Sequence, residues 1–339
     1  MSALKIAFVS SHPSLRRFRR DPSYIYRCEN LGLALQRLGH RVSFVHLKAL
    51  LLPRRFDVAV FLRPSDALLY RHVVARLRRQ GTVLVGDCDD LLFDPACAAF
   101  RPSVINGSAD RDETAAKFRR HHDALAALDR FIFSTEELSD RYRALHPDAA
   151  VTILPNAVHS GWRDIAPNPA PPRVLTYFSG TRTHDRDIAL IAAPLQRVLD
   201  AQPDLSVQLV GPITPPFSHP RLLVRKKVAF TDYPYVLRDS YLNLAPLEDT
   251  PFNRSKSALK AIEPGFFEVP TIASPVGDFT RVAVDGVRYA RDDAEWEAQI
   301  AAACAPERHA QLRHGLRQRI LAHADIDRFA EAFVRFVAH

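Results

Sequence analysis

The sequence predicts an α/β protein built from two Rossmann-like halves in series. With 339 residues, the chain is longer than a single typical hydrophobic core needs. Short apolar runs alternate with helical patterns along its whole length, which is typical of parallel sheets covered by helices. Between the halves lies Ala166-Pro167-Asn168-Pro169-Ala170-Pro171-Pro172, which can form neither a helix nor a central strand and indicates a linker.

In the first half, buried strands are expected at residues 5–10, 41–47, 56–63, 82–86, 130–134 and 151–154. Helical patterns separate them at residues 24–38, 66–80, 112–128 and 135–145. After the linker, strands are expected at 174–178, 206–210, 222–230, 242–246 and 271–274. The helices expected there are 185–201, 233–240, 254–267, 293–304, 307–323 and 325–338. We therefore expect domains at 1–160 and 161–323, and a final helix within 324–339 that packs back on the first domain.

The net charge and the arginine clusters indicate that the protein binds an anionic partner. The chain carries a net charge of +8, and arginines cluster at 16–20, 54–55, 76–79 and 119–120. Such clusters suit an anionic membrane, a nucleic acid or a phosphorylated substrate, although arginine-rich coding from a GC-rich genome would give the same composition. Aromatic residues do not interleave with the basic clusters, so nucleic acid is not expected as a partner.

The spacing of the cysteines and the length of the apolar runs indicate in which cellular compartment the protein is expected. Cys28, Cys88, Cys97 and Cys304 have neither zinc-ligand spacing nor the density of a disulfide framework. No apolar run approaches the roughly 20 residues of a membrane-spanning helix. The sequence therefore predicts a cytoplasmic protein, with association at the inner face of the cell membrane as an option left open by the arginine clusters.

One predicted helix, 254–267, combines cations with a carboxylate. Lys256, Lys260 and Glu263 are spaced i, i+4 and i+7 and would share one face. A ligand with phosphates and vicinal hydroxyls, such as a nucleotide sugar, would suit that face. A solvated helix surface is the alternative.

A turn follows the first strand of the second half. Its sequence is Ser179-Gly180-Thr181-Arg182, and the helix expected at 185–201 comes next. Gly180 would let a ligand approach the backbone, and the helix N-terminus would favour an anion. Arg182 and Arg186 could neutralise a diphosphate. A tight turn with Asp185 as the helix N-cap is the alternative.

The segment from Leu244 to Ser257, followed by Val269-Pro270-Thr271-Ile272, resembles the donor-site segment of GT-B glycosyltransferases of the family 4-like (group 1) type. The resemblance covers nearly the whole chain. It implies two Rossmann-like domains with parallel sheets facing across a cleft, and a nucleoside-diphosphate sugar as co-substrate, with no metal or other cofactor. It places Glu263 on the ribose hydroxyls. The donor site that it implies consists of Ser179, Gly180, Thr181, Arg182, Arg186, Asn253, Lys256, Lys260 and Glu263.

Three positions depart from the family pattern. Ser255 replaces a glutamate that the family often carries near the donor sugar. Pro264 lacks a helical donor and should kink or interrupt the helix. Glu268 replaces a glycine that usually precedes the following strand.

Three aspartates follow a buried strand of the first half, in Gly86-Asp87-Cys88-Asp89-Asp90. Clustered carboxylates are costly unless they are solvated, paired or metal-bound. Asp87-Cys88-Asp89 matches the Asp-x-Asp metal motif of another transferase fold, GT-A, but that pattern is common by chance and the two-half architecture argues against it. The resemblance implies that Asp89 or Asp90 faces the acceptor or the sugar, and either could be a general base in an inverting reaction.

The expected activity is transfer of a hexosyl or deoxyhexosyl group to a saccharide or lipid-linked acceptor, in bacterial surface polysaccharide synthesis. The expected catalytic residues are Asp89, Asp90, Arg182 and Lys256. The loop after the first strand and the helix that follows would bind the acceptor through His12, Arg16, Arg17 and Tyr26; a mobile, solvated loop is the alternative. The rival functions are a nucleotide-sugar epimerase of the same fold and a non-catalytic sugar- or lipid-binding module.

Overall fold

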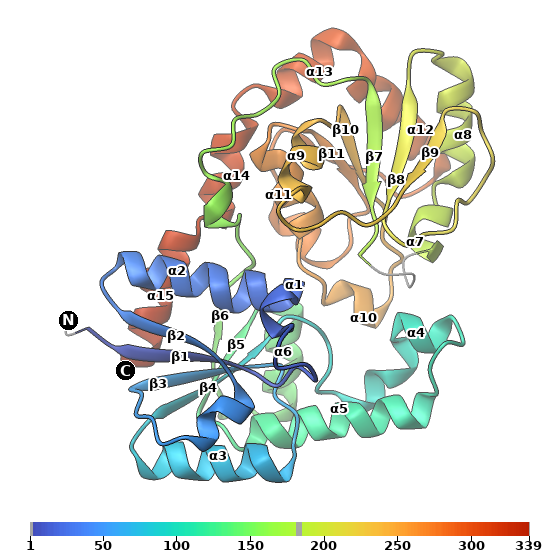
Figure 1. Cartoon of the computed structure of the whole chain (residues 1–339). Coiled ribbons are helices and arrows are strands. Elements are labelled where there is room, and N and C mark those ends of the chain that lie inside the picture. Colours follow the sequence, from blue (N-terminus) through green and yellow to red (C-terminus); the bar gives the residue numbers. More distant parts are fainter. Residues whose placement is uncertain (1–2, 181–184, 339) are drawn as a thin grey trace. The chain divides into compact units, whose positions relative to one another are not determined.

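The computed structural model describes residues 3–180 and 185–338, which form two compact units (Figure 1). The first unit contains Met1–Ser160, Ser255–Ser257 and Asp325–His339. The second contains Gly161–Arg254 and Ala258–Ala324. Three residues from the middle of the second half of the sequence therefore belong to the first unit.

The first unit is built on a six-stranded parallel sheet with the order β2-β1-β3-β4-β5-β6. Its strands are β1 (Lys5–Ser10), β2 (Arg41–His46), β3 (Val58–Leu62), β4 (Val83–Cys88), β5 (Arg130–Phe133) and β6 (Ala150–Ile153). The register pairs Ser10 with Leu62, and Leu62 with Asp87. Because all the strands are parallel, the residues that follow them meet at one edge of the sheet.

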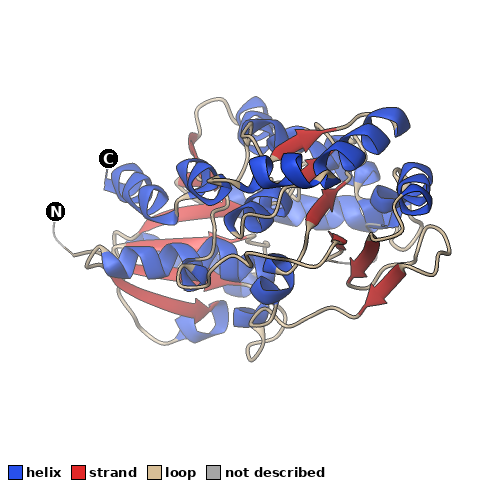
Figure 2. Ribbon diagram, turned by 90° about the horizontal axis from the view of Figure 1, so that it is seen from above, coloured by secondary structure: helices blue, strands red, loops and turns tan. Residues whose placement is uncertain are grey.

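Helices flank this sheet (Figure 2). The helices of the unit are α1 (Pro22–Tyr24), a π-helical turn η2 (Ile25–Glu29), α2 (Asn30–Arg37), α3 (Leu68–Arg79), α4 (Pro102–Ile105), α5 (Arg111–Ala126), α6 (Glu136–Leu145) and α15 (Ile326–Ala338). α15 lies beside α2, and its buried Phe333 contacts Phe8 of β1, with the ring centroids 6.3 Å apart (Figure 1). The last helix of the chain thus completes the core of the first unit.

The second unit has its own six-stranded parallel sheet, with the order β12-β11-β10-β7-β8-β9. Its strands are β7 (Val174–Phe178), β8 (Ser206–Val210), β9 (Leu222–Arg225), β10 (Leu242–Ala245), β11 (Thr271–Ala273) and β12 (Val287–Tyr289). β12 was not predicted from the sequence. The strand is only three residues long and directly follows Gly286, whose φ of +105° ends any regular pattern before it.

The second unit has the helix expected at 293–304, and most of its other helices are shorter than expected. The helices of this unit are α7 (Asp185–Ala189), α8 (Ala192–Ala201), α9 (Tyr233–Arg238), α10 (Pro251–Arg254), α11 (Leu259–Phe266), α12 (Asp293–Cys304), α13 (Pro306–Arg313) and α14 (Leu316–Ala324). The helix expected at 254–267 begins only at Leu259, after α10 has ended at Arg254, and the single helices expected at 185–201 and 307–323 are each divided in two. In the last case Gly315 adopts a left-handed φ of +66°, which ends α13 before α14 begins.

The expected interruption at Pro264 was wrong, because α11 continues through it. Proline cannot donate to the carbonyl of Lys260, four residues earlier. The side-chain Nδ2 of Asn243, in β10, donates to that carbonyl at 2.7 Å instead. Asn243 is buried and also donates to Thr271 Oγ1 at 3.2 Å. The neighbouring strand thus supplies the donor that the helix lacks.

Glu268 also has a structural explanation. Its φ is +57°, the left-handed conformation that glycine commonly takes just after a helix. The amide of Glu268 donates to Gly265 O at 3.1 Å, and that of Val269 donates to Pro264 O at 3.0 Å. These two bonds form a Schellman motif that ends α11, so the glutamate occupies a position where glycine would be less strained.

Candidate active site

A buried ion pair lies at the carboxyl edge of the first unit's sheet. Asp87 is the fifth residue of β4, and its side chain is 0% exposed. Arg27, from the π-helical turn, donates from Nε to Asp87 Oδ1 at 3.0 Å and approaches the same oxygen through Nη2 at 2.9 Å. Its Nη1 donates to Leu154 O at 2.6 Å and to Asn156 Oδ1 at 3.1 Å. Asp87 is therefore neutralised inside the fold and is not available to a ligand.

Asp89 and Asp90 share a second arginine. Arg63 follows β3 and has a left-handed φ of +43°, which is strained for a residue with a side chain. Its Nε donates to Asp89 Oδ1 at 2.5 Å, and its Nη2 lies 3.8 Å from Asp90 Oδ2. The aspartate side chains are 8% and 26% exposed, respectively. Asp89 is thus held by Arg63, while Asp90 is the more accessible carboxylate.

The pKa values of the two aspartates move in opposite directions. Burial alone would raise the pKa of Asp89, but the adjacent Arg63 guanidinium lowers it overall. Burial raises the pKa of Asp90, although Arg63 and Lys256 oppose the shift. Of these two carboxylates, Asp90 is the one whose proton affinity has moved toward that of a general base.

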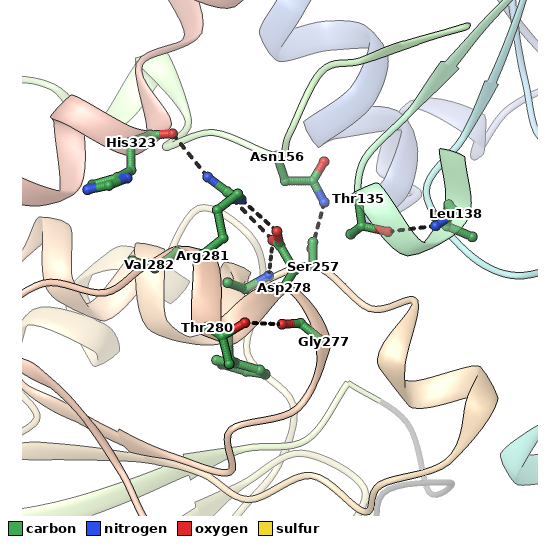
Figure 3. A network of polar contacts seen from close by, with 12 residues as sticks. Thr135, Leu138, Asn156, Ser257, Gly277, Asp278, Thr280, Arg281, Val282 and His323 are labelled. Carbon is green, nitrogen blue, oxygen red and sulfur yellow. Dashed lines mark hydrogen bonds and ion pairs between the residues drawn. The ribbon is translucent and has the colours of Figure 1, made fainter. Parts of the chain in front are cut away.

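The sequence predicted that Lys256 would share a helix face with Lys260 and Glu263. In the structure it does not, because Lys256 precedes the helix that carries the other two. It belongs to the segment Ser255–Ser257, between α10 and α11, which packs in the first unit. Ser255 O accepts a bond from Thr135 Oγ1 at 3.1 Å. Figure 3 shows the second contact, in which Asn156 Nδ2 donates to Ser257 Oγ at 2.9 Å. The ends of β5 and β6 thereby hold the segment, and the charge of Lys256 acts on Asp90.

In the second unit, Ser179 and Gly180 follow β7. Ser179 is buried, and its amide donates to Val210 O at 2.7 Å. Gly180 is exposed, and apart from its chain neighbours no described atom lies within 4 Å of where a Cβ would stand. The backbone at this turn is therefore accessible to a ligand. Thr181 and Arg182 lie outside the residues that the structure describes.

The helix that follows this turn is a weaker anion site than expected. α7 has only five residues, and Asp185 and Asp187 both lie in its first turn. Arg186 forms a two-point ion pair with Glu248, including a bond from Nε to Oε2 at 3.1 Å. Its positive charge is thus already balanced.

Glu263 lies on α11 and is 4% exposed, so it is not an ordinary surface glutamate. The hydroxyl of Tyr233, at the start of α9, donates to Glu263 Oε2 at 3.0 Å. Burial and the neighbouring Glu263 carboxylate raise the pKa of Tyr233, which keeps this hydroxyl protonated as a donor. The carboxylate is thus oriented by a fixed partner.

Two further residues expected to bind the donor lie near the strand ends of this unit. The Nζ of Lys260 lies 4.6 Å from the centroid of the Tyr177 ring and 3.5 Å from its hydroxyl. Asn253 is buried, and its Nδ2 donates to Glu248 O at 2.9 Å.

The residues expected to bind an acceptor all belong to the first unit. His12 Nδ1 accepts a bond from the amide of Ser14 at 3.0 Å, so its side chain shapes the loop. Arg16 and Arg17 are exposed. The ring of Tyr26 packs edge-on against that of His159, with the centroids 6.4 Å apart.

Across residues 3–180 and 185–338, no helix is long and apolar enough to cross a membrane. The same residues contain no cluster of three or more histidine, cysteine or acidic side chains arranged to bind a metal ion.

No protein-family model and no curated protein matches the sequence. Solved structures do match. Sucrose-phosphate synthase from Thermosynechococcus elongatus superposes with a TM-score of 0.70 at 15% identity, over 98% of both chains. HepE from Anabaena, solved with UDP and glucose, gives a TM-score of 0.64 at 11% identity over 99% of both chains. The chain has the GT-B fold.

Another GT-B neighbour comes from Listeria monocytogenes and is described as a UDP-N-acetylglucosamine 2-epimerase. Its TM-score is 0.55 at 9% identity, over 99% of this chain and 95% of that one. At such identities the likeness establishes the fold, and the predicted GT-B architecture is confirmed.

Sequence reasoning missed several residues that shape this GT-B chain's candidate site. Arg63 directly follows a strand, so the rule that strand ends share an edge could have placed it beside Asp89. Arg27 and Asn156 carried no such signal, because their partners are distant in the sequence. Tyr233 was also not identifiable, since its link to Glu263 spans 30 positions.

Proposed function

We propose that this protein is a glycosyltransferase that uses a nucleoside-diphosphate sugar. The observation that carries the proposal is the buried carboxylate of Glu263, oriented by Tyr233 in the second Rossmann-like unit. A carboxylate with a fixed direction suits the vicinal hydroxyls of a ribose. The GT-B fold supports it, and HepE, a neighbour of that fold, was solved with UDP and glucose.

In this proposal the second unit binds the donor. Glu263 would accept hydrogen bonds from the ribose hydroxyls, and the accessible backbone at Ser179 and Gly180 would face the diphosphate. Thr181 and Arg182, which follow Gly180 in the sequence, belong to the proposed donor set together with Lys260 and Asn253. Arg186 can contribute only by releasing Glu248, because the two form an ion pair. Positive charge beside the diphosphate would stabilise the negative charge that develops on this leaving group in the transition state, and it would thereby increase the rate of transfer.

The first unit would bind the acceptor and hold the catalytic base. Asp90 is more accessible than Asp89 and is not fixed by a close ion pair. We assign Asp90 the role of removing the proton from an acceptor hydroxyl in an inverting reaction. Asp89 would position Arg63, and Lys256 would tune Asp90 through its charge.

Nucleotide titration tests the donor site. Replacing Glu263 with alanine should weaken nucleoside-diphosphate binding by roughly tenfold or more, because charge-assisted hydrogen bonds to the ribose are lost. Tyr233→Phe should give a smaller loss, since it removes only the orienting donor. Glu307→Ala, at an exposed position on α13, is the matched control. Unchanged affinity in Glu263→Ala would contradict the site.

An epimerase is the second candidate, favoured by the fold shared with the Listeria protein. A panel of nucleotide sugars, incubated without and with saccharide or lipid-linked acceptors, separates the functions. Acceptor-dependent release of nucleoside diphosphate supports a transferase, and sugar isomerisation without acceptor supports an epimerase. Binding with neither reaction would indicate a binding module. The same panel tests the expected hexosyl or deoxyhexosyl donor and the expected role in surface polysaccharide synthesis.

We also propose that the first unit contacts an anionic membrane. The loop 11–20 packs against the end of β2, where His46 Nε2 contacts His12 O at 2.7 Å. Leu15, Leu51 and Leu52 are 52%, 56% and 63% exposed. Neither residues 11–20 nor 47–56 contain an acidic side chain, and arginines at 16, 17, 20, 54 and 55 are exposed. Exposed leucines among arginines suit insertion at an anionic lipid surface.

A further inference from the structure

Backbone hydrogen bonds connect the carboxyl ends of three strands of the second unit, β7, β8 and β9, at the turn after β7. The amide of Ser179 donates to Val210 O at 2.7 Å, and the amide of Gly211 donates to Arg225 O at 2.9 Å. Gly211 has a φ of +122°, and a Cβ there would lie 2.1 Å from Ser179 O. Only glycine permits this approach. The ends of β7, β8 and β9 therefore form one rigid platform.

The platform brings a lysine from the edge strand to the turn. Lys227 lies two residues after β9, and its Nζ lies 3.4 Å from Gly180 O. The side chain is exposed, and among the described residues no carboxylate forms an ion pair with it. An ammonium group thus lies beside the open backbone of Gly180 with its charge uncompensated.

Arg182 lies outside the residues that the structure describes, and two other cations expected to bind the diphosphate, Arg186 and Lys256, have other interactions. Arg186 is paired with Glu248, and Lys256 belongs to the first unit, where its charge acts on Asp90. The first turn of α7 contributes the negative charges of Asp185 and Asp187. A dianionic group at the turn would meet these carboxylates unless a further cation offset them.

We propose that Lys227 binds the diphosphate of the nucleotide at the Ser179–Gly180 turn. This inference rests on the proposed function and adds a residue from the edge strand to the donor site. An ammonium on a flexible stem can follow a phosphate that changes position during the reaction. The contact to Gly180 O would hold the side chain at the turn before the ligand arrives.

Comparing Lys227→Ala with Lys226→Ala tests the assignment, because the adjacent lysine shares the basic run and its exposure. Calorimetric titration would follow a nucleoside diphosphate and its monophosphate, and ligand-detected NMR would follow the nucleoside. Lys227→Ala should weaken diphosphate binding by roughly tenfold and leave nucleoside binding unchanged. Lys226→Ala should match the wild type, and Lys227→Arg should restore part of the affinity. The salt dependence of diphosphate binding should decrease in Lys227→Ala alone.

The inference is overturned if Lys227→Ala binds the diphosphate like the wild type, or if it loses diphosphate and nucleoside affinity equally. In the second case the residue supports the base or the fold. If Glu263→Ala still weakens binding while Lys227→Ala does not, the proposed function stands and only the role of Lys227 fails. If the wild type binds no nucleoside diphosphate, both fail.

Discussion

At the scale of residues, three neighbouring aspartates have different environments. Asp87 is fully buried and paired with Arg27, which also bonds to Leu154 O and Asn156. Asp89 is held by Arg63, and Asp90 keeps an exposed edge. The sequence could not rank them, because each role depends on an arginine brought in from another element. The chemistry that we assign to Asp90 follows from its partial exposure and its weaker pairing.

We expect Asp90→Asn to reduce turnover by about 10²-fold or more, because a general base typically contributes that much. Nucleotide affinity should remain unchanged, since Asp90 lies in the first unit. In the wild type, turnover should fall as pH decreases through the raised pKa of Asp90, above the ordinary value of 3.8. Steady-state kinetics across pH measures both effects.

Asp89→Asn is the matched comparison. It removes the charge that holds Arg63, so we expect a loss of thermal stability along with any loss of activity. If Asp90→Asn keeps full turnover, or if the acid limb persists unchanged in it, Asp90 is not the base.

At the scale of elements, α11 shows how a strand supports a helix. Pro264 removes one helical hydrogen bond, and Asn243 of β10 replaces it at the carbonyl of Lys260. The bond ties the middle of the helix that carries Lys260 and Glu263 to the sheet. A proline that should weaken the candidate donor site is thus accommodated by a buried amide.

A double-mutant cycle tests this arrangement. Asn243→Ala should lower the free energy of unfolding by about 1–3 kcal/mol, because it leaves a buried carbonyl without its donor. Adding Pro264→Ala should recover about 1 kcal/mol, since the amide of residue 264 can then donate to Lys260 O. Urea denaturation measures each variant. Strictly additive effects would show that Asn243 does not substitute for the missing helical donor.

Across the described residues, some positive side chains form ion pairs and others are exposed to solvent. Much of the positive charge in the described structure forms ion pairs, such as Arg27 with Asp87 and Arg186 with Glu248. Segments 11–20 and 47–56 differ, because they contain exposed leucines and no acidic residue together with the exposed arginines 16, 17, 20, 54 and 55. That distribution is the basis for the proposed membrane contact.

We expect the full chain to co-sediment with vesicles that contain phosphatidylglycerol and not with phosphatidylcholine alone. Binding should weaken at high salt, because the electrostatic attraction is screened. Leu51→Ser with Leu52→Ser should reduce binding even at low salt, whereas Leu223→Ser, an exposed leucine on β9, should not. Equal binding to both vesicle types, or preference for an RNA competitor, would contradict a lipid partner.

From local periodicity and from proline, the amino-acid sequence predicted the alternation of strands and helices, the linker and the two-half architecture. It also identified Glu263 and the aspartate cluster as candidates. It did not predict β12, the breaks within two of the expected helices or the position of Lys256 outside α11. The position of Lys256 depends on contacts between distant residues, such as Asn156 with Ser257, whereas β12 and α14 each follow a glycine with a positive φ. Which charges are paired inside the fold and which remain available to a ligand depends on how elements distant in the sequence pack together.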